Sequence, residues 1–188
     1  MKLREKNPAL ILIDIQKAFL DEKYWGGNRN NKNAEETSGL LLNRFRELNL
    51  PIFHVRHSSL NGNSKLHASN VGFSFNDFVQ PMFDEPIITK NVNSSFIGTN
   101  LKEMLYDKNI TTLIIVGLTT DHCVSTTTRM AGNYGYETYL ISDATATFDK
   151  IGINNEKYSA ELIHLTSLAS LNEELAIIWD SNKLLNEL

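Results

Sequence analysis

Length, composition and charge limit the class of protein. The chain has 188 residues, 41% hydrophobic and 21% charged, which predicts one globular domain over residues 1–188 with a sizeable core. The formal net charge of −4, without a block of lysine and arginine, excludes an extended surface for nucleic acid or anionic membranes. A single cysteine excludes an internal disulfide, and the apolar stretch at residues 9–13 is too short for a signal peptide or a membrane span. We therefore expect a cytoplasmic protein.

Strands and helices are predicted to alternate along the chain. Short apolar runs mark the strands, at residues 9–13, 52–55, 86–89, 113–116, 136–141 and 175–179. Helices are expected at residues 34–49, after Thr99, at 123–134, at 158–171 and in the C-terminal tail, with a long polar loop at 58–80. This alternation predicts an α/β fold in which helices cover both faces of a parallel sheet.

Residues with reactive or titratable side chains follow the predicted strands. In parallel sheets of this kind, the functional site lies beyond the carboxyl ends of the strands. The residues found there, in chain order, are Asp14, His57, Lys90, Cys123 and Asp143. A carboxylate can accept a thiol proton, and a lysine ammonium can stabilise a thiolate and hold the carboxylate in place. These groups indicate thiol chemistry at one edge of the sheet.

Cys123 is the only cysteine, and it is expected in the first turn of a helix that follows a strand and Gly117. Unpaired backbone N–H groups and the positive end of the helix dipole lower the pKa of a thiol at such a position. The same N–H groups can hold an oxyanion. The alternative is that this cysteine is only a small buried hydrophobic side chain.

Four motifs, taken together and in order, resemble those of the isochorismatase-like cysteine hydrolase superfamily. They lie at residues 14–19 (DIQKAF), 90–99 (KNVNSSFIGT), 117–124 (GLTTDHCV) and 143–147 (DATAT). Each motif alone is weak, whereas the set of four is specific. The resemblance implies a three-layer α/β/α, Rossmann-like fold with a six-stranded parallel sheet.

The resemblance also implies a catalytic triad of Asp14, Lys90 and Cys123. It implies a cis peptide bond before Thr119, so that the backbone N–H groups of Thr119 and Cys123 form an oxyanion hole. Because hydrolysis of a vinyl ether does not require a thiol, the cysteine favours cleavage of an amide-type C–N bond of a small molecule through a thioester. The alternatives are an isochorismatase-type ether hydrolase and a catalytically silent small-molecule-binding protein of the same fold.

Some of these residues also have purely structural interpretations. Asp14 could be a helix N-cap after a strand, and Lys90 could be a solvated surface lysine. Neither interpretation explains why a carboxylate, an amine and a thiol share one edge of the sheet. For Asp143 the structural interpretation is preferred, because aspartate is common in turns and caps.

Nicotinamidases of this superfamily bind a metal through an Asp-x-His pair after the second strand and a later histidine. In this chain His57 stands at the aspartate position and Ser59 at the first histidine position. His54, His57 and His67 could supply imidazole ligands, but His54 and His57 are three residues apart on a strand and point to opposite faces. We therefore expect no metal site and no cofactor.

The residues expected to bind substrate are inferred from position alone. They are Phe19, Trp25, His57, Phe96 and His122. The loop at residues 58–80 is expected to cover the site of its own subunit or of a neighbouring one. Members of the superfamily are commonly dimers or larger, and the apolar face at residues 159–171 predicts a homodimer or a higher homo-oligomer.

Overall fold

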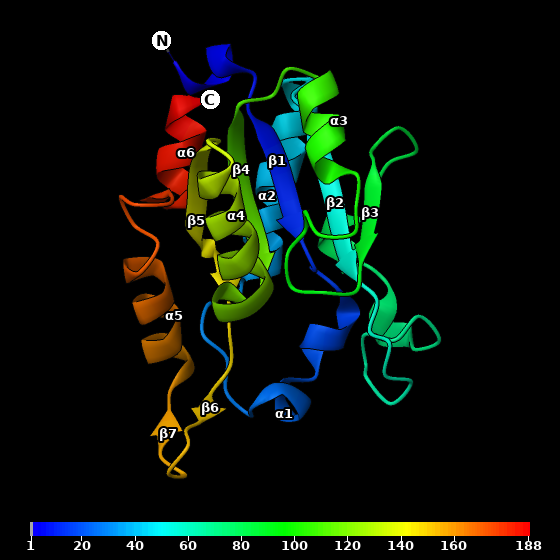
Figure 1. The fold of residues 1–188 in the computed structure, drawn as a ribbon, viewed down its shortest axis with the longest axis vertical. Helices are drawn as coiled ribbons and strands as arrows, with labels where there is room; N and C mark the ends of the chain where they lie inside the picture. Colours follow the sequence, from blue (N-terminus) through cyan, green and yellow to red (C-terminus); the bar gives the residue numbers. More distant parts are fainter. Residues whose placement is uncertain (1) are drawn as a thin grey trace.

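The computed structural model describes residues 2–188 and has a parallel sheet at its centre (Figure 1). The strands lie in the order β3-β2-β1-β4-β5-β8, and every neighbouring pair is parallel. Their bounds are β1 Ala9–Ile13, β2 Ile52–His57, β3 Ile87–Lys90, β4 Thr112–Leu118, β5 Glu137–Ala146 and β8 Ile177–Trp179. The strand order reverses between β1 and β4, which is where a site is expected in such a sheet.

Helices cover both faces of the sheet (Figure 1). Their bounds are α1 Glu22–Trp25, α2 Ala34–Glu47, α3 Leu101–Asp107, α4 Ser125–Asn133, α5 Ala160–Ala169 and α6 Ser181–Glu187. Successive side chains of a strand alternate between the faces. Leu10 and Leu12 of β1 therefore pack in the core under α2 and α6, whereas Ile11 and Ile13 pack in the core under α3, α4 and α5. The expected three-layer α/β/α fold is confirmed, and no helix within residues 2–188 is long and apolar enough to cross a membrane.

The chain is tightly packed where β4 ends. Gly117 has a φ of +130°, and a Cβ at this position would lie 2.0 Å from the carbonyl oxygen of Ile13. Only glycine allows β4 to approach the end of β1 so closely. A π-helical turn, Thr120–Val124, follows, and regular helix begins only at Ser125, later than the predicted start of the helix at Cys123.

A small antiparallel hairpin that was not predicted follows β5 in the chain. It consists of β6, Lys150–Ile151, and β7, Lys157–Tyr158. The hairpin takes up the first residue of the helix expected at 158–171, and α5 begins only after Ser159, whose side chain accepts a hydrogen bond from the Leu162 N–H. Pairing with a neighbouring strand decides such boundaries, and periodicity along the chain does not report it.

The loop at residues 58–80 folds back against the end of β1 in its own chain. It contains 3₁₀ turns at Val71–Phe73 and Asp77–Val79. Gln16, just beyond β1, forms a β-bridge with Phe75 and donates a hydrogen bond of 2.8 Å from Nε2 to the Phe73 carbonyl. These contacts hold the loop beside the carboxyl edge of the sheet, at the lower right of Figure 1.

Apolar side chains are exposed on α5 and on the neighbouring hairpin, which lie next to each other in Figure 1. They are Leu162 and Leu165 on the helix and Ile151 and Ile153 on the hairpin. A surface of this kind suits contact with a second subunit. The homo-oligomer itself stays a prediction.

Candidate active site

A buried ion pair lies at the carboxyl edge of the sheet. Asp14 directly follows β1 and is 1% exposed, and Lys90 is the last residue of β3 and is 2% exposed. Lys90 Nζ donates a hydrogen bond of 2.5 Å to Asp14 Oδ2. Asp14 Oδ1 is buried and has no hydrogen-bond partner among residues 2–188. The second carboxylate oxygen is therefore free to accept a proton from a group in the site.

The structural interpretations of Asp14 and Lys90 do not hold. The 3₁₀ turn that follows β1 starts at Lys17 and has Gln16, not Asp14, as its N-cap. Lys90 is buried rather than solvated. Asp143, in contrast, has a structural role: its carboxylate accepts hydrogen bonds from the Ser181 N–H and from Ser181 Oγ, at the start of α6.

His57, at the end of β2, contacts the same lysine. Its Nδ1 lies 3.3 Å from Lys90 Nζ, and because an ammonium group can only donate, Nδ1 must be the acceptor. Gln16 fixes the backbone of His57 by donating to its carbonyl and accepting from its N–H. Burial, and next the Lys90 charge, lower the pKa of His57, so the imidazole is neutral at neutral pH.

Cys123 lies in the π-helical turn and faces this pair. One ligand atom from each of Asp14, His57 and Cys123 lies within 4.8 Å of the others. Burial, and next the Asp14 charge, raise the pKa of the Cys123 thiol, although the Lys90 charge acts in the opposite direction. The expectation of a lowered pKa is therefore wrong, because desolvation and a neighbouring carboxylate outweigh the helix dipole and the lysine. The resting thiol is protonated at neutral pH and needs a base.

Backbone donors line the site beside the thiol. The peptide bond between Leu118 and Thr119 is cis, which is the bond implied by the resemblance. Thr119 and Cys123 both line the cavity that contains the thiol. The Thr119 N–H donates no hydrogen bond to another group within the described residues. An N–H group without a protein partner is available to an oxygen atom of a bound molecule.

The thiol opens into a cavity of about 240 Å³. Four of the residues expected to bind substrate line it, namely Phe19, Trp25, His57 and His122. Phe19 is the centre of an aromatic wall, with ring centroids 4.7 Å from Trp25 and 6.2 Å from Phe148. The cavity is smaller than typical sites for drug-sized ligands, which are about 300–1,000 Å³, and it therefore suits a small molecule with a flat part.

Phe96 was expected to bind substrate, and this expectation is wrong. Its ring packs against Tyr134 and Tyr136, at centroid distances of 5.3 Å and 6.0 Å, in the core on the α4 side of the sheet. The chain turns away from the site after Lys90, because the Ser95 N–H donates to Thr127 Oγ1 on α4. A residue that follows a strand end closely in the sequence can still place its side chain in the core rather than in the site.

The sequence alone did not reveal the remaining residues of the cavity wall. These are Ser59, Ser64, Leu66, Asn93, Phe148 and Lys150. Three of them come from the loop at residues 58–80, so this loop covers the site of its own chain. Asn93 lies in the motif after Lys90 and could have been proposed from that motif, whereas Phe148 and Lys150 lie beyond the last motif and carried no signal.

Known proteins share both the sequence and the fold. A model of the isochorismatase domain matches residues 8–180. The chain belongs to the isochorismatase family. It is 51% identical over 183 residues to YrdC, an uncharacterized isochorismatase family protein of Bacillus subtilis, and the match covers 97% of both chains. A solved structure of an isochorismatase-family protein from Chromobacterium violaceum has a TM-score of 0.94 and 36% identity, and the match covers 100% of this chain and 96% of that one.

A shorter match connects this isochorismatase-family hydrolase to an amidase. Nicotinamidase 3 of Arabidopsis thaliana is 35% identical over 81 residues, which is 43% of this chain and 38% of the plant protein. The contacts of three histidines show whether they could be ligands of the metal that the resemblance to nicotinamidases suggested. His54 Nε2 hydrogen-bonds Glu85, His67 Nδ1 hydrogen-bonds Ser69, and only His57 of the three lines the cavity. The three histidines do not form a metal site.

The remaining candidate ligand set is Asp14, His57 and Cys123. Lys90 Nζ hydrogen-bonds Asp14 and lies within 3.3 Å of His57 Nδ1, so a fixed positive charge contacts two of the three groups. Like charges at this separation repel strongly in a buried site. The residues of this isochorismatase-family site therefore do not fit a resident divalent ion.

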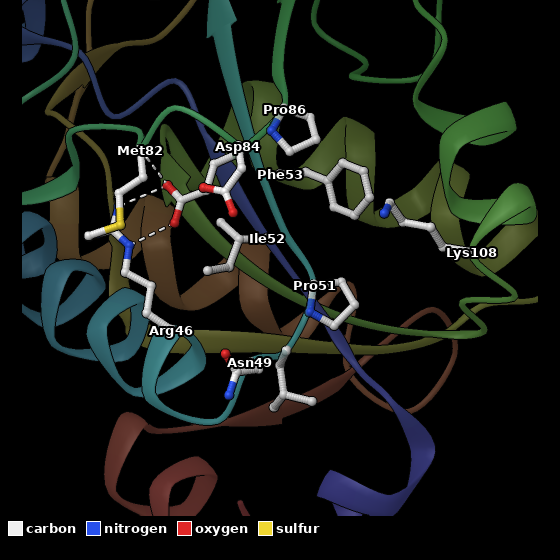
Figure 2. Close-up of a pocket in the computed structure, with 11 residues that line it drawn as sticks. Arg46, Asn49, Pro51, Ile52, Phe53, Met82, Asp84, Pro86 and Lys108 are labelled. Atoms are coloured by element: carbon white, nitrogen blue, oxygen red, sulfur yellow. Dashed lines mark hydrogen bonds and ion pairs between the residues drawn. The ribbon is translucent and has the colours of Figure 1, made fainter.

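A second cavity, of about 430 Å³, opens at the amino ends of β2 and β3. Figure 2 shows the residues that line it. Arg46 and Met82 meet at one wall of this cavity, where both hydrogen-bond the carboxylate of Glu85. The buried His54 contacts the same carboxylate. This cluster ties α2 to the segment before β3, and we interpret it as structural.

The Glu85 cluster predicts acid sensitivity of the fold. Burial raises the pKa of Glu85, but hydrogen bonds from Arg46, the Met82 N–H and His54 lower it to about 2, against an ordinary value of 4.5. A carboxyl with a lowered pKa in the folded state stabilises the protein above its unfolded pKa. That stabilisation is lost as the pH falls from about 4.5 towards about 2.

We expect Glu85→Gln to lower the free energy of unfolding at pH 7. The difference from the unmodified protein should shrink as the pH falls from 4.5 towards 2, because the carboxylate then becomes protonated in both states. Urea unfolding of both proteins at several pH values measures this difference. Asp84→Asn, which changes a neighbouring carboxylate of the same cavity wall, is the control. A difference that does not depend on pH would contradict the role of the Glu85 charge.

Proposed function

We propose that this isochorismatase-family protein is a cysteine-dependent hydrolase that cleaves an amide-type C–N bond of a small molecule through a thioester. One observation carries the proposal. Asp14 is paired with buried Lys90, keeps one carboxylate oxygen without a partner among the described residues, and has a carboxylate oxygen within 4.8 Å of the Cys123 sulfur in the wall of a small cavity. A base, a nucleophile and a binding space are therefore adjacent.

The proposed reaction starts with a proton transfer. Asp14 takes the proton of the Cys123 thiol while the sulfur attacks the carbonyl carbon of the substrate. The raised pKa of the thiol makes this general-base step necessary. The Lys90 ammonium hydrogen-bonds the Asp14 carboxylate and holds it in place beside the thiol.

The tetrahedral intermediate then collapses. Its oxyanion accepts hydrogen bonds from the backbone N–H groups of Thr119 and Cys123, each of which contributes about 3–4 kcal/mol in comparable sites. The proton on Asp14 passes to the leaving nitrogen, the C–N bond breaks, and a thioester remains on Cys123. Asp14 next takes a proton from water, the hydroxide attacks the thioester, and the acid product leaves as the thiol regains its proton.

The comparison with Arabidopsis nicotinamidase supports an amide substrate, because that relative is named for the hydrolysis of an amide. The nature of the nucleophile supports it as well, since a thiol forms acyl intermediates readily. The aromatic wall of Phe19, Trp25 and Phe148 suits a planar group such as an amide, a ureido group or a ring.

A panel of small primary amides, ureido compounds and cyclic amides tests the proposal, with ammonia release or ring opening as the measurement. The unmodified protein should turn over at least one class, and Cys123→Ala serves as the blank. Equal turnover by the protein and the blank would reject the thiol mechanism. Turnover of a vinyl ether in place of any amide would favour the ether hydrolase.

We expect activity on the amide to survive removal of divalent metals. The base, the thiol and the backbone donors provide an acyl-transfer route, and the Lys90 charge opposes a divalent ion beside Asp14 and His57. Dialysis against a strong chelator should leave turnover unchanged, and elemental analysis should find much less than one metal ion per chain. A loss that Zn²⁺ or Mn²⁺ restores would contradict this expectation.

A further inference from the structure

We propose that Lys150 binds a carboxylate of the substrate at the mouth of the cavity, so that the substrate is a small amide or ureido compound with an acidic group. This inference rests on the proposed function of the same cavity. Lys150 was not among the residues expected from the sequence, but it lines the cavity together with Cys123 and His122. The chemistry of its surroundings indicates what it binds.

The backbone of Lys150 is held in place. Lys150 is the first residue of β6 and pairs with Tyr158 of β7. The preceding residue, Asp149, accepts hydrogen bonds from Asn28 and from the Ala160 N–H at the start of α5. Phe148, one residue earlier, belongs to the aromatic wall. Lys150 is therefore built into the rim of the cavity rather than carried on a free loop.

The ammonium group of Lys150 has unused hydrogen-bonding capacity. Within residues 2–188 its acidic neighbour is Asp121, at 3.3 Å between Nζ and Oδ2, and no hydrogen bond joins the two groups. Other lysine ion pairs of the chain are much closer, such as Lys17 with Asp77 at 2.7 Å. Three ammonium protons thus remain for an acceptor that enters the cavity.

Besides Lys150, one formally charged group lines the cavity among the described residues. That group is Asp14, whose carboxylate is paired with the ammonium of Lys90, and Lys90 itself does not line the cavity. Asp121 does not line the cavity, and Thr147 Oγ1 occupies its other oxygen. A ligand in the cavity therefore meets the ammonium group of Lys150, which lies 3.3 Å from Asp121 Oδ2 and belongs to a side chain that is 29% exposed. A partly desolvated ammonium binds a carboxylate by a charge-assisted hydrogen bond.

The alternative is that Lys150 only stabilises the Asp121 carboxylate. Lys150 does help to lower the pKa of Asp121, after burial, which raises it, and the hydrogen bond from Thr147, which lowers it. The absence of a hydrogen bond and the position in the cavity wall favour ligand binding over this purely structural role. The two roles differ in one measurable property, which is whether the Lys150 charge affects molecules that enter the cavity.

Alkylation of Cys123 measures this property without any substrate. Iodoacetate and iodoacetamide react with a thiol in the same way, with attack of sulfur on carbon and loss of iodide, but only iodoacetate carries a carboxylate. Cys123 is the only cysteine, so all labelling reports on this cavity. The raised thiol pKa slows both reagents equally, and the ratio of the iodoacetate rate to the iodoacetamide rate therefore reports on the Lys150 charge.

We expect this ratio to be at least about tenfold higher in the folded protein than in the urea-unfolded protein, as one charge-assisted hydrogen bond predicts. Lys150→Met should remove most of the increase, and Lys150→Arg should keep most of it. Lys157→Met is the matched control, because Lys157 lies on the same hairpin and does not line the cavity. A ratio that Lys150→Met leaves unchanged in a folded protein, shown by circular dichroism, would overturn the proposal.

A pair of substrates separates this inference from the proposed function. N-carbamoylglycine and propylurea have the same ureido group, but only the first carries a carboxylate. Lys150→Met should raise KM for the acid at least about tenfold more than it raises KM for the neutral compound. Turnover of amides without preference for the acid would reject the role of Lys150 alone. Absence of turnover with a Lys150-dependent alkylation ratio would reject the hydrolase alone.

Discussion

Cys123→Ala is expected to lower amide hydrolysis at least about a thousandfold, because the variant has no atom that can form the thioester. The fold should remain, since alanine is smaller than cysteine and position 123 is only partly buried, beside the cavity. Ammonia release, normalised to protein with an unchanged circular dichroism spectrum, measures the effect. Cys123→Ser should lose nearly as much activity, because an alcohol is a weaker acid than a thiol and Asp14 is a weak base for it.

Measuring the serine variant together with the alanine variant tests whether the thiol is the nucleophile. If both variants hydrolysed the amide at the rate of the unmodified protein, the thiol would not be the nucleophile. A mechanism in which Asp14 activates water directly would then take its place. Mass spectrometry of an acid-quenched reaction provides a second measurement, since a thioester adds the mass of the acyl group to the unmodified protein and not to Cys123→Ala.

Asp14→Asn should produce two opposite effects. Turnover should fall at least about a thousandfold, because an amide cannot accept the thiol proton. Alkylation of Cys123 by iodoacetamide at pH 7 should become faster, because the Asp14 charge raises the thiol pKa and the Lys90 charge lowers it. With the carboxylate removed and the lysine retained, the pKa falls and more thiolate is present.

Stability must be measured in the same variant. Removal of one partner from a buried ion pair costs about 3–5 kcal/mol, so Asp14→Asn should unfold at a lower urea concentration. Asp143→Asn is the matched control, because Asp143 is structural and holds Ser181 at the start of α6. That variant should lose stability and keep turnover and the alkylation rate. Slower alkylation of folded Asp14→Asn would contradict the expected fall of the thiol pKa.

The sequence by itself determined the order of the strands along the chain and which reactive residues lie near their carboxyl ends, although β2, β4 and β5 extend further than predicted. Asp14, His57, Lys90 and Cys123 were predicted to share one edge of the sheet, and the structure brings them together. The physical reason is that parallel strands of apolar residues have one arrangement, with all carboxyl ends on the same side. The two faces of β1 were likewise set by alternation along the strand.

Only the tertiary structure decided where the chain goes after each strand end. Phe96 and Asn93 follow Lys90 in one segment, yet Asn93 lines the cavity and Phe96 packs in the core, because Ser95 is bound to Thr127. Lys150 lies on the β6–β7 hairpin, which is held beside the cavity by the hydrogen bond from Asn28, far away in the sequence, to Asp149. Contacts between segments far apart in the chain fix these directions, and no local pattern reports them.

The pKa of the Cys123 thiol shows most clearly what the sequence determined and what the tertiary structure decided. The local sequence predicted a helix start at Cys123, and a helix dipole lowers the pKa of a thiol. The surrounding fold buries Cys123 and places the Asp14 carboxylate next to it, and both effects raise that pKa. Desolvation and charge depend on every group packed around an atom, including groups from β1 and β3. The sequence therefore determined which residue is the thiol, and the tertiary structure decided that this thiol needs a base.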